Sequence, residues 1–165
     1  MKNGLIWGGF LFAALLLQST ILPLLAYNGV YGDLLLMIVV LASLHLGKKQ
    51  GAMIGFSAGL LEDLVSGTFF GINTFTKLLL GYLFGLAERK VFKENIVLPV
   101  IAAIVATIGS YFISALLMVS LGYRFDLLEN MVTMLVPLLI YNVILSLPIH
   151  KLVCKVSIMA KESNH

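Results

Sequence analysis

Long apolar runs, broken only by short clusters of charged or turn-forming residues, are the feature that most constrains this chain. Hydrophobic residues make up 60% of its 165 residues and charged residues only 12%. The mean hydropathy of +1.03 is far above the range of a soluble domain. Because a helix satisfies its own backbone hydrogen bonds inside lipid, we predict an all-α integral membrane protein.

The apolar runs predict six transmembrane helices, since about 20 residues for each span and short loops use nearly the whole chain. We expect the helices at about 5–26, 33–47, 51–65, 71–87, 96–121 and 131–148. Residues 1–150 then form one transmembrane domain. Residues 151–165 form a short basic tail, which we expect to lie on the anionic cytoplasmic face of the membrane.

The positions of the basic residues predict that both termini are cytoplasmic. In the six-helix arrangement nine of the eleven lysines and arginines lie on the inner side, as the positive-inside rule requires. These nine are Lys2, Lys48, Lys49, Arg89, Lys90, Lys93, Lys151, Lys155 and Lys161. Arg124 falls outside and Lys77 falls within a span.

Glycines at four-residue spacing mark the third and fourth predicted helices as the centre of the fold. Small residues at this spacing let helix backbones approach closely, which drives helix association in lipid. We predict helix packing or partner binding at Gly51, Gly55, Gly59, Gly67, Gly71, Gly81 and Gly85.

Two adjacent acids and one lysine lie within this glycine-rich hairpin. If the hairpin turns near Thr68, Asp63 lies about 8 Å and Lys77 about 13 Å below the turn. We therefore expect Lys77 to pair with Asp63, or failing that with Glu62, because an isolated charge there would cost several kcal/mol. The alternative is that Lys77 reaches up to the outer interface and the acids stay hydrated.

Catalysis is not expected from these residues. No nucleophile accompanies Glu62 and Asp63, and neighbouring side chains on a helix point about 100° apart. Proton-coupled transport would need polar groups through the whole membrane, and they concentrate in the predicted outer half. The three histidines show no ligand spacing and Cys154 is the only cysteine, so we predict no metal site and no cofactor.

The chain resembles the bacterial rod shape-determining protein MreD family. The resemblance rests on Asp33 before a leucine-rich helix, the glycines of the third helix, Asp63, Ser66 with Gly67, and a following helix with Gly81 and Gly85. It implies a non-enzymatic scaffold of the cell-wall elongation machinery in the bacterial inner membrane. The implied partners are MreC and membrane lipids and, indirectly, MreB, the glycosyltransferase RodA and its penicillin-binding transpeptidase, with no nucleic acid.

A second interpretation belongs to another functional class. The MreD family is similar in fold to the vitamin-binding S components of energy-coupling factor transporters, which also have six helices and cytoplasmic termini. S components present an Ala-x-x-x-Ala pattern on their first helix. This chain has Leu17 and Gln18 four residues after Ala13 and Ala14, so the pattern is absent at that place, although Gly4 and Gly8 could substitute for it. A third interpretation, a lipid-precursor binder that uses Arg124, is compatible with the scaffold.

Overall fold

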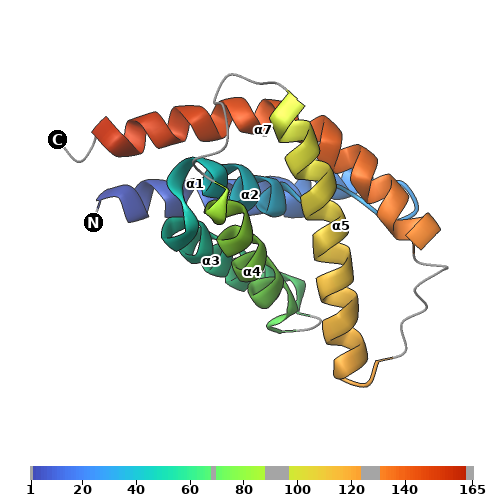
Figure 1. Ribbon diagram of the computed structural model, residues 1–165. Helices are drawn as coiled ribbons and strands as arrows, with labels where there is room; N and C mark the ends of the chain where they lie inside the picture. Colours follow the sequence, from blue (N-terminus) through green and yellow to red (C-terminus); the bar gives the residue numbers. More distant parts are fainter. Residues whose placement is uncertain (1, 68–69, 88–96, 124–130, 163–165) are drawn as a thin grey trace.

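The computed structural model describes residues 2–67, 70–87, 97–123 and 131–162 (Figure 1). Within these ranges the chain forms six α-helices and no strand. The helices are α1 (Lys2–Thr20), α2 (Leu34–Leu46), α3 (Lys48–Ser66), α4 (Ile72–Leu86), α5 (Val97–Ser120) and α7 (Val136–Glu162). A 3₁₀ turn, η1 (Leu22–Leu25), follows α1, and a π-helical turn, η3 (Met131–Leu135), precedes α7. The predicted all-helical fold is confirmed for the described residues.

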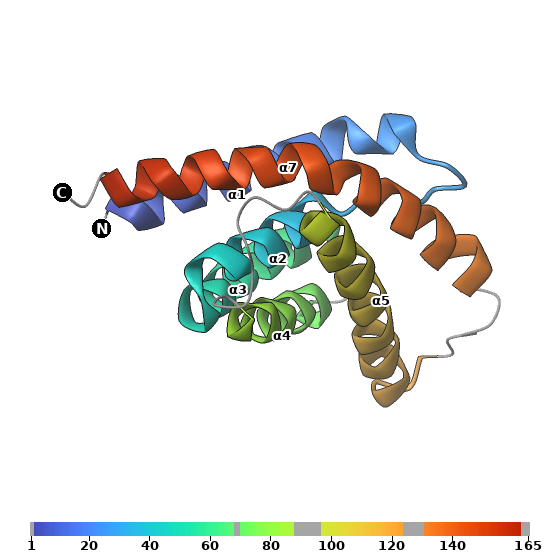
Figure 2. The same ribbon diagram turned by 45° about the horizontal axis from the view of Figure 1, so that its top comes forward.

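Helix α2 is the centre of the bundle. All ten residues from Leu35 to Leu44 are buried, as expected for a helix that is surrounded on every side. It packs against α1, α3, α4, α5 and α7. Figure 2 shows α1 and α7 side by side along one flank, the α3–α4 hairpin on the other, and α5 crossing obliquely.

The first helix ends at Thr20, before the expected end at about residue 26, whereas the last helix continues beyond its expected end. Pro23 lies in η1, directly after α1. We expected the final helix to end near Pro148, and this is wrong, because α7 continues through Pro148 to Glu162. Proline is tolerated inside membrane helices where neighbours satisfy the freed backbone group, and it explains why α7 bends along its length in both views (Figures 1 and 2). Residues Val153 and Ala160, in the part expected to be a tail, are buried.

The helices differ in how well they match a bilayer. Among the described helices, α5 and the segment Met131–Ala160 are long and apolar enough to cross one, whereas Gly4–Thr20, α2 and α4 are apolar but shorter. The 13 residues of α2 extend only about 20 Å, against a hydrocarbon core of about 30 Å. Six full spans therefore stay a prediction. The start of α1 and the end of α7 lie at the same end of the bundle in both views (Figures 1 and 2).

Candidate functional site

Helices α3 and α4 form the most extensive helix pair and meet backbone to backbone along the predicted glycine row. A Cβ atom added to Gly51 would lie 2.5 Å from the carbonyl oxygen of Gly81. One added to Gly55 or Gly59 would overlap the α4 backbone at Lys77 or Asn73, and one added to Gly85 would overlap Lys48. These glycines therefore pack α3 against α4 inside the bundle.

Gly67 and Gly71 have a different role from the one predicted. A Cβ atom at either position would meet nothing within 4 Å, so neither glycine is needed for close packing. Both have positive φ, +62° and +104°, a backbone region that glycine enters without steric cost. Gly67 ends α3 in a left-handed conformation and Gly71 begins α4. They shape the turn of the hairpin.

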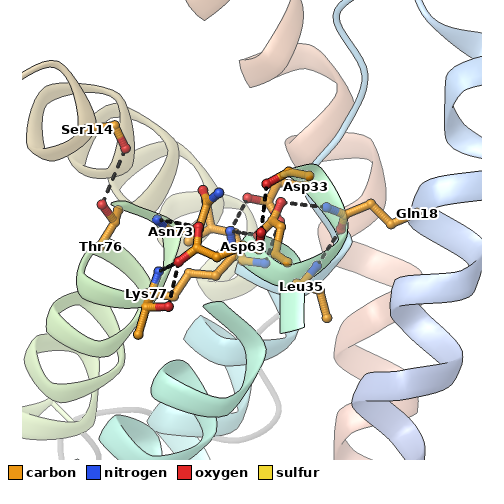
Figure 3. Close-up of polar contacts among 12 residues, drawn as sticks. Gln18, Asp33, Leu35, Asp63, Asn73, Thr76, Lys77 and Ser114 are labelled. Atoms are coloured by element: carbon orange, nitrogen blue, oxygen red, sulfur yellow. Dashed lines mark hydrogen bonds and ion pairs between the residues drawn. The ribbon is translucent and has the colours of Figure 1, made fainter. Parts of the chain in front are cut away.

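Lys77 lies between two carboxylates in the interior of the bundle (Figure 3). Its Nζ donates to Asp33 Oδ2 at 2.7 Å and forms a second ion pair with Glu62. The side chains of Lys77, Asp33 and Glu62 are only 3%, 20% and 17% exposed. We call these three residues the charge cluster. The alternative in which Lys77 reaches the interface and the acids stay hydrated is wrong.

Asp63 does not pair with Lys77, so the first choice of partner was wrong and Glu62, the second, is confirmed. Asp63 instead accepts hydrogen bonds from the backbone N–H groups of Gly71, Asn73 and Thr74 at 2.9, 3.2 and 2.9 Å, and from the Thr74 hydroxyl at 2.5 Å. The first N–H groups of a helix have no partner within the helix. A carboxylate there also interacts favourably with the helix dipole. Asp63 of α3 therefore caps α4.

Asp63→Ala is expected to lower the free energy of unfolding by about 2–3 kcal/mol, because it leaves buried N–H donors of α4 without a charged acceptor. Thr74→Ala is the matched control, since it removes one of the four bonds to Asp63 and leaves the three backbone donors satisfied. The measurement is reversible unfolding in mixed detergent micelles. Equal losses in the two variants would contradict the capping role.

Gln18 connects the charge cluster to α1. Its side-chain amide donates to Glu62 Oε1 at 2.8 Å and its oxygen accepts from the backbone N–H of Leu35 at 2.9 Å. Leu35 lies in the first turn of α2, so one buried glutamine joins α1, α2 and α3. The polarity of Gln18, Ser19 and Thr20 at the end of α1 predicts that all three side chains face protein. This is confirmed for Gln18, which is 6% exposed, and wrong for Ser19 and Thr20, which are exposed.

Asn142 connects the cluster to the remaining helices. Its Oδ1 accepts from the backbone N–H of Asp33 at 2.8 Å, and its Nδ2 donates to Thr107 Oγ1 at 2.9 Å. Asn142 and Thr107 are fully buried. A lone asparagine in an apolar helix predicts an interhelical hydrogen bond, and for Asn142 this is confirmed. One polar network thus takes a side chain from every α-helix, namely Gln18, Asp33 at the start of α2, Glu62, Lys77, Thr107 and Asn142.

The bonding of the charge cluster indicates a structural role and not a catalytic one. The Lys77 ammonium is held by both carboxylates and is closed off from solvent, so it is not available to a substrate as a nucleophile or proton donor. Asp33 also caps α2, because its Oδ1 accepts from Leu36 N at 2.8 Å. Each acid thus has a structural role in the network.

A second group of polar side chains lies in a place that we did not predict. His45 of α2 and His150 of α7 stack with ring centroids 5.6 Å apart, and the Cys154 sulfur lies against both rings. The histidines show no ligand spacing in the sequence, but the fold brings two of them together. His150 and Cys154 are four residues apart, a helical spacing that could have signalled the group. His165 and Arg124, with the lipid-binding interpretation that used Arg124, lie outside the described residues, as does the charged loop 88–96.

The profile of the rod shape-determining protein MreD family matches residues 2–157, nearly the whole chain. The chain belongs to the MreD family. MreD proteins are membrane proteins with a role in determining rod shape, and they are not known as enzymes. No match was found among curated proteins or among solved structures.

The motif residues of the MreD resemblance have distinct places in this structure. Asp33 lies in the charge cluster, Asp63 caps α4, and Gly67 ends α3. The Ser66 hydroxyl lies 3.5 Å from the Asp63 carbonyl, at the same turn. These four residues therefore lie at the start of α2 and at the α3–α4 turn, whereas the glycines of the resemblance lie along the α3–α4 contact.

Proposed function

We propose that this MreD protein is a non-enzymatic, multi-pass scaffold of the bacterial inner membrane that binds MreC and helps organise peptidoglycan synthesis. Family membership supports the role in rod shape. The observation that carries the scaffold role is the polar network, because its ionisable groups are bonded to one another and hold six helices together. RodA, its penicillin-binding transpeptidase and MreB join indirectly, through the elongation machinery.

The network also supports a six-span topology with both termini in the cytoplasm. In that topology the end of α1, the start of α2, the end of α3 and the start of α4 lie at the outer side. Gln18, Asp33, Glu62 and Lys77 come from these four places and are in contact. On this topology residues 1–150 form the transmembrane domain, and residues 151–165 form the basic cytoplasmic end of the chain, helical as far as Glu162.

The partner's helix must bind elsewhere than the glycine row, because that row is occupied by α4. The surface of α3 that faces away from the other helices has an open groove of about 310 Å³. It is lined by Ala52, Met53, Phe56, Ser57 and Leu78. The side chains of Ala52 and Ser57 are small, whereas the large side chains of Met53 and Phe56 are exposed. Such a hollow suits the side chains of a transmembrane helix, and we propose it as the MreC contact.

Capture from native membranes in mild detergent tests this proposal. We expect the tagged protein to recover MreC, and Ser57→Leu, which fills the groove, to reduce recovery by roughly tenfold, the effect of 1.4 kcal/mol. Ser19→Leu is the matched control, because Ser19 is an exposed helical serine on α1. Failure of the unchanged protein to recover MreC would contradict the partner, and full recovery by Ser57→Leu would contradict the groove.

The transporter alternative predicts a different result from the same capture. An S component would bring down the transporter's ATPase subunits or a bound vitamin. The structure favours the scaffold because the polar groups at the predicted outer half are bonded to one another. The likeness to the S component fold stays a prediction.

A further inference from the structure

His45, His150 and Cys154 form a cluster at the end of α2 that is opposite the charge cluster. Asp33 caps the first turn of α2, whereas His45 lies in its last turn. His150 and Cys154 project from neighbouring turns of α7 towards it. We call these three residues the His–Cys cluster.

The distances within the His–Cys cluster match those of a tetrahedral metal site. The Cys154 sulfur lies 3.4 Å from His45 Nε2 and 3.8 Å from His150 Nε2. With Zn–S near 2.3 Å and Zn–N near 2.1 Å, tetrahedral geometry places sulfur and nitrogen about 3.6 Å apart. One candidate ligand atom from each residue lies within 4.8 Å of the others. The two sulfur–nitrogen distances therefore fit an ion directly, whereas the stacked imidazoles must rotate to turn their nitrogen atoms towards it.

One buried nitrogen atom of the His–Cys cluster is difficult to explain by packing alone. The Nδ1 atom of His150 is buried and has no hydrogen-bond partner among the described residues. A buried polar atom without a partner is costly, so an apolar residue would pack better there. All three side chains are nevertheless only partly buried, which leaves a route for an ion to enter.

We propose that the His–Cys cluster binds one Zn²⁺ ion through His45, His150 and Cys154, with water at the fourth position. Two imidazoles and a thiolate are ligands of borderline-soft ions such as Zn²⁺. On the proposed topology the cluster lies towards the cytoplasm, where thiols stay reduced. The ion joins the end of α2 to α7. This inference is independent of the scaffold role and of MreC.

Metal titration of the full chain, purified in mild detergent with a tag that lacks histidine, tests the site. We expect one Co²⁺ per chain to give tetrahedral d–d absorption and a thiolate-to-cobalt charge-transfer band, and Zn²⁺ to displace it. Cys154→Ser should abolish the charge-transfer band. We expect it and His150→Gln each to weaken Zn²⁺ binding at least about 100-fold, since even outer partners of a metal ligand contribute 10–100-fold.

His165→Gln is the control, because His165 is the histidine outside the cluster. It should leave the stoichiometry and the cobalt spectrum unchanged. Zn²⁺ should also raise the midpoint of thermal unfolding of the unchanged protein and of His165→Gln, but not of Cys154→Ser. The proposal is overturned if Co²⁺ gives no thiolate band, or if Cys154→Ser binds Zn²⁺ as tightly as the unchanged protein.

Discussion

Gly55→Ala is expected to lower the free energy of unfolding by about 3 kcal/mol or more, although alanine is the better helix former. The added Cβ would overlap the backbone carbonyl of Lys77, and backbone cannot move aside as a flexible side chain can. Overpacked cores typically lose about 1–3 kcal/mol, and here α3 and α4 must separate along the most extensive helix contact of the bundle. Unfolding in mixed detergent micelles measures the loss.

Gly8→Ala is the matched control for Gly55→Ala. Gly8 is also a helical glycine, but a Cβ there meets nothing within 4 Å. Helix propensity alone then predicts a change between zero and about 1 kcal/mol of stabilisation. If Gly55→Ala were as harmless as Gly8→Ala, the backbone contact between α3 and α4 would be refuted.

Lys77→Met is expected to cost about 3–5 kcal/mol, the loss seen when one partner is removed from a buried ion pair. The methionine fills the space of the lysine stem, so the loss of stability measures the removal of the charge and not a loss of packing. Two carboxylates, Asp33 and Glu62, would then be left in the bundle with no cation. Lys49→Met, an exposed lysine on α3, should change stability by less than about 0.5 kcal/mol.

Neutralising the carboxylates should reverse much of this loss. Glu62→Gln retains an oxygen that can accept from Gln18, and Asp33→Asn retains one that can cap Leu36. We expect the triple variant Asp33→Asn, Glu62→Gln and Lys77→Met to be more stable than Lys77→Met alone by at least about 2 kcal/mol. If the triple variant were instead less stable than Lys77→Met by the sum of the separate losses, the three residues would not form one unit.

The helices and the close contact of α3 with α4 could be predicted because each leaves a local pattern. Apolar runs between charged breaks gave six segments, and the spacing of Gly51, Gly55 and Gly59 indicated a backbone approach that the structure contains. Asp63 was correctly singled out but given the wrong role. Its position eight residues before Gly71 allows it to cap the next helix, whereas we predicted an ion pair with Lys77.

The partners of Lys77 depend on contacts that a local pattern does not carry. Asp33 is 44 residues away in the chain and precedes a different helix. We predicted a partner within the α3–α4 hairpin. Alternating helix directions place the start of α2 beside the start of α4, and this consequence of the predicted topology was the available signal.

The His–Cys cluster was missed because of one wrong helix end. Ending the last helix at Pro148 placed His150 and Cys154 in a tail. Their four-residue spacing predicts a shared helix face only if the helix continues past Pro148. Proline is a strong helix terminator in water, but packing against α1 and α2 supports α7 beyond it. Tertiary contacts therefore overrode the local rule.

If the charge cluster acts only by holding the bundle together, its charges can be removed without loss of function as long as none is left unpaired. Cell shape tests it most directly, in a rod-shaped bacterium whose only copy carries the charge-free triple variant. We predict that these cells stay rod-shaped while cells with Lys77→Met alone become round. Round cells that contain a stably folded triple variant at normal levels would contradict the claim, because the charges themselves would then be needed.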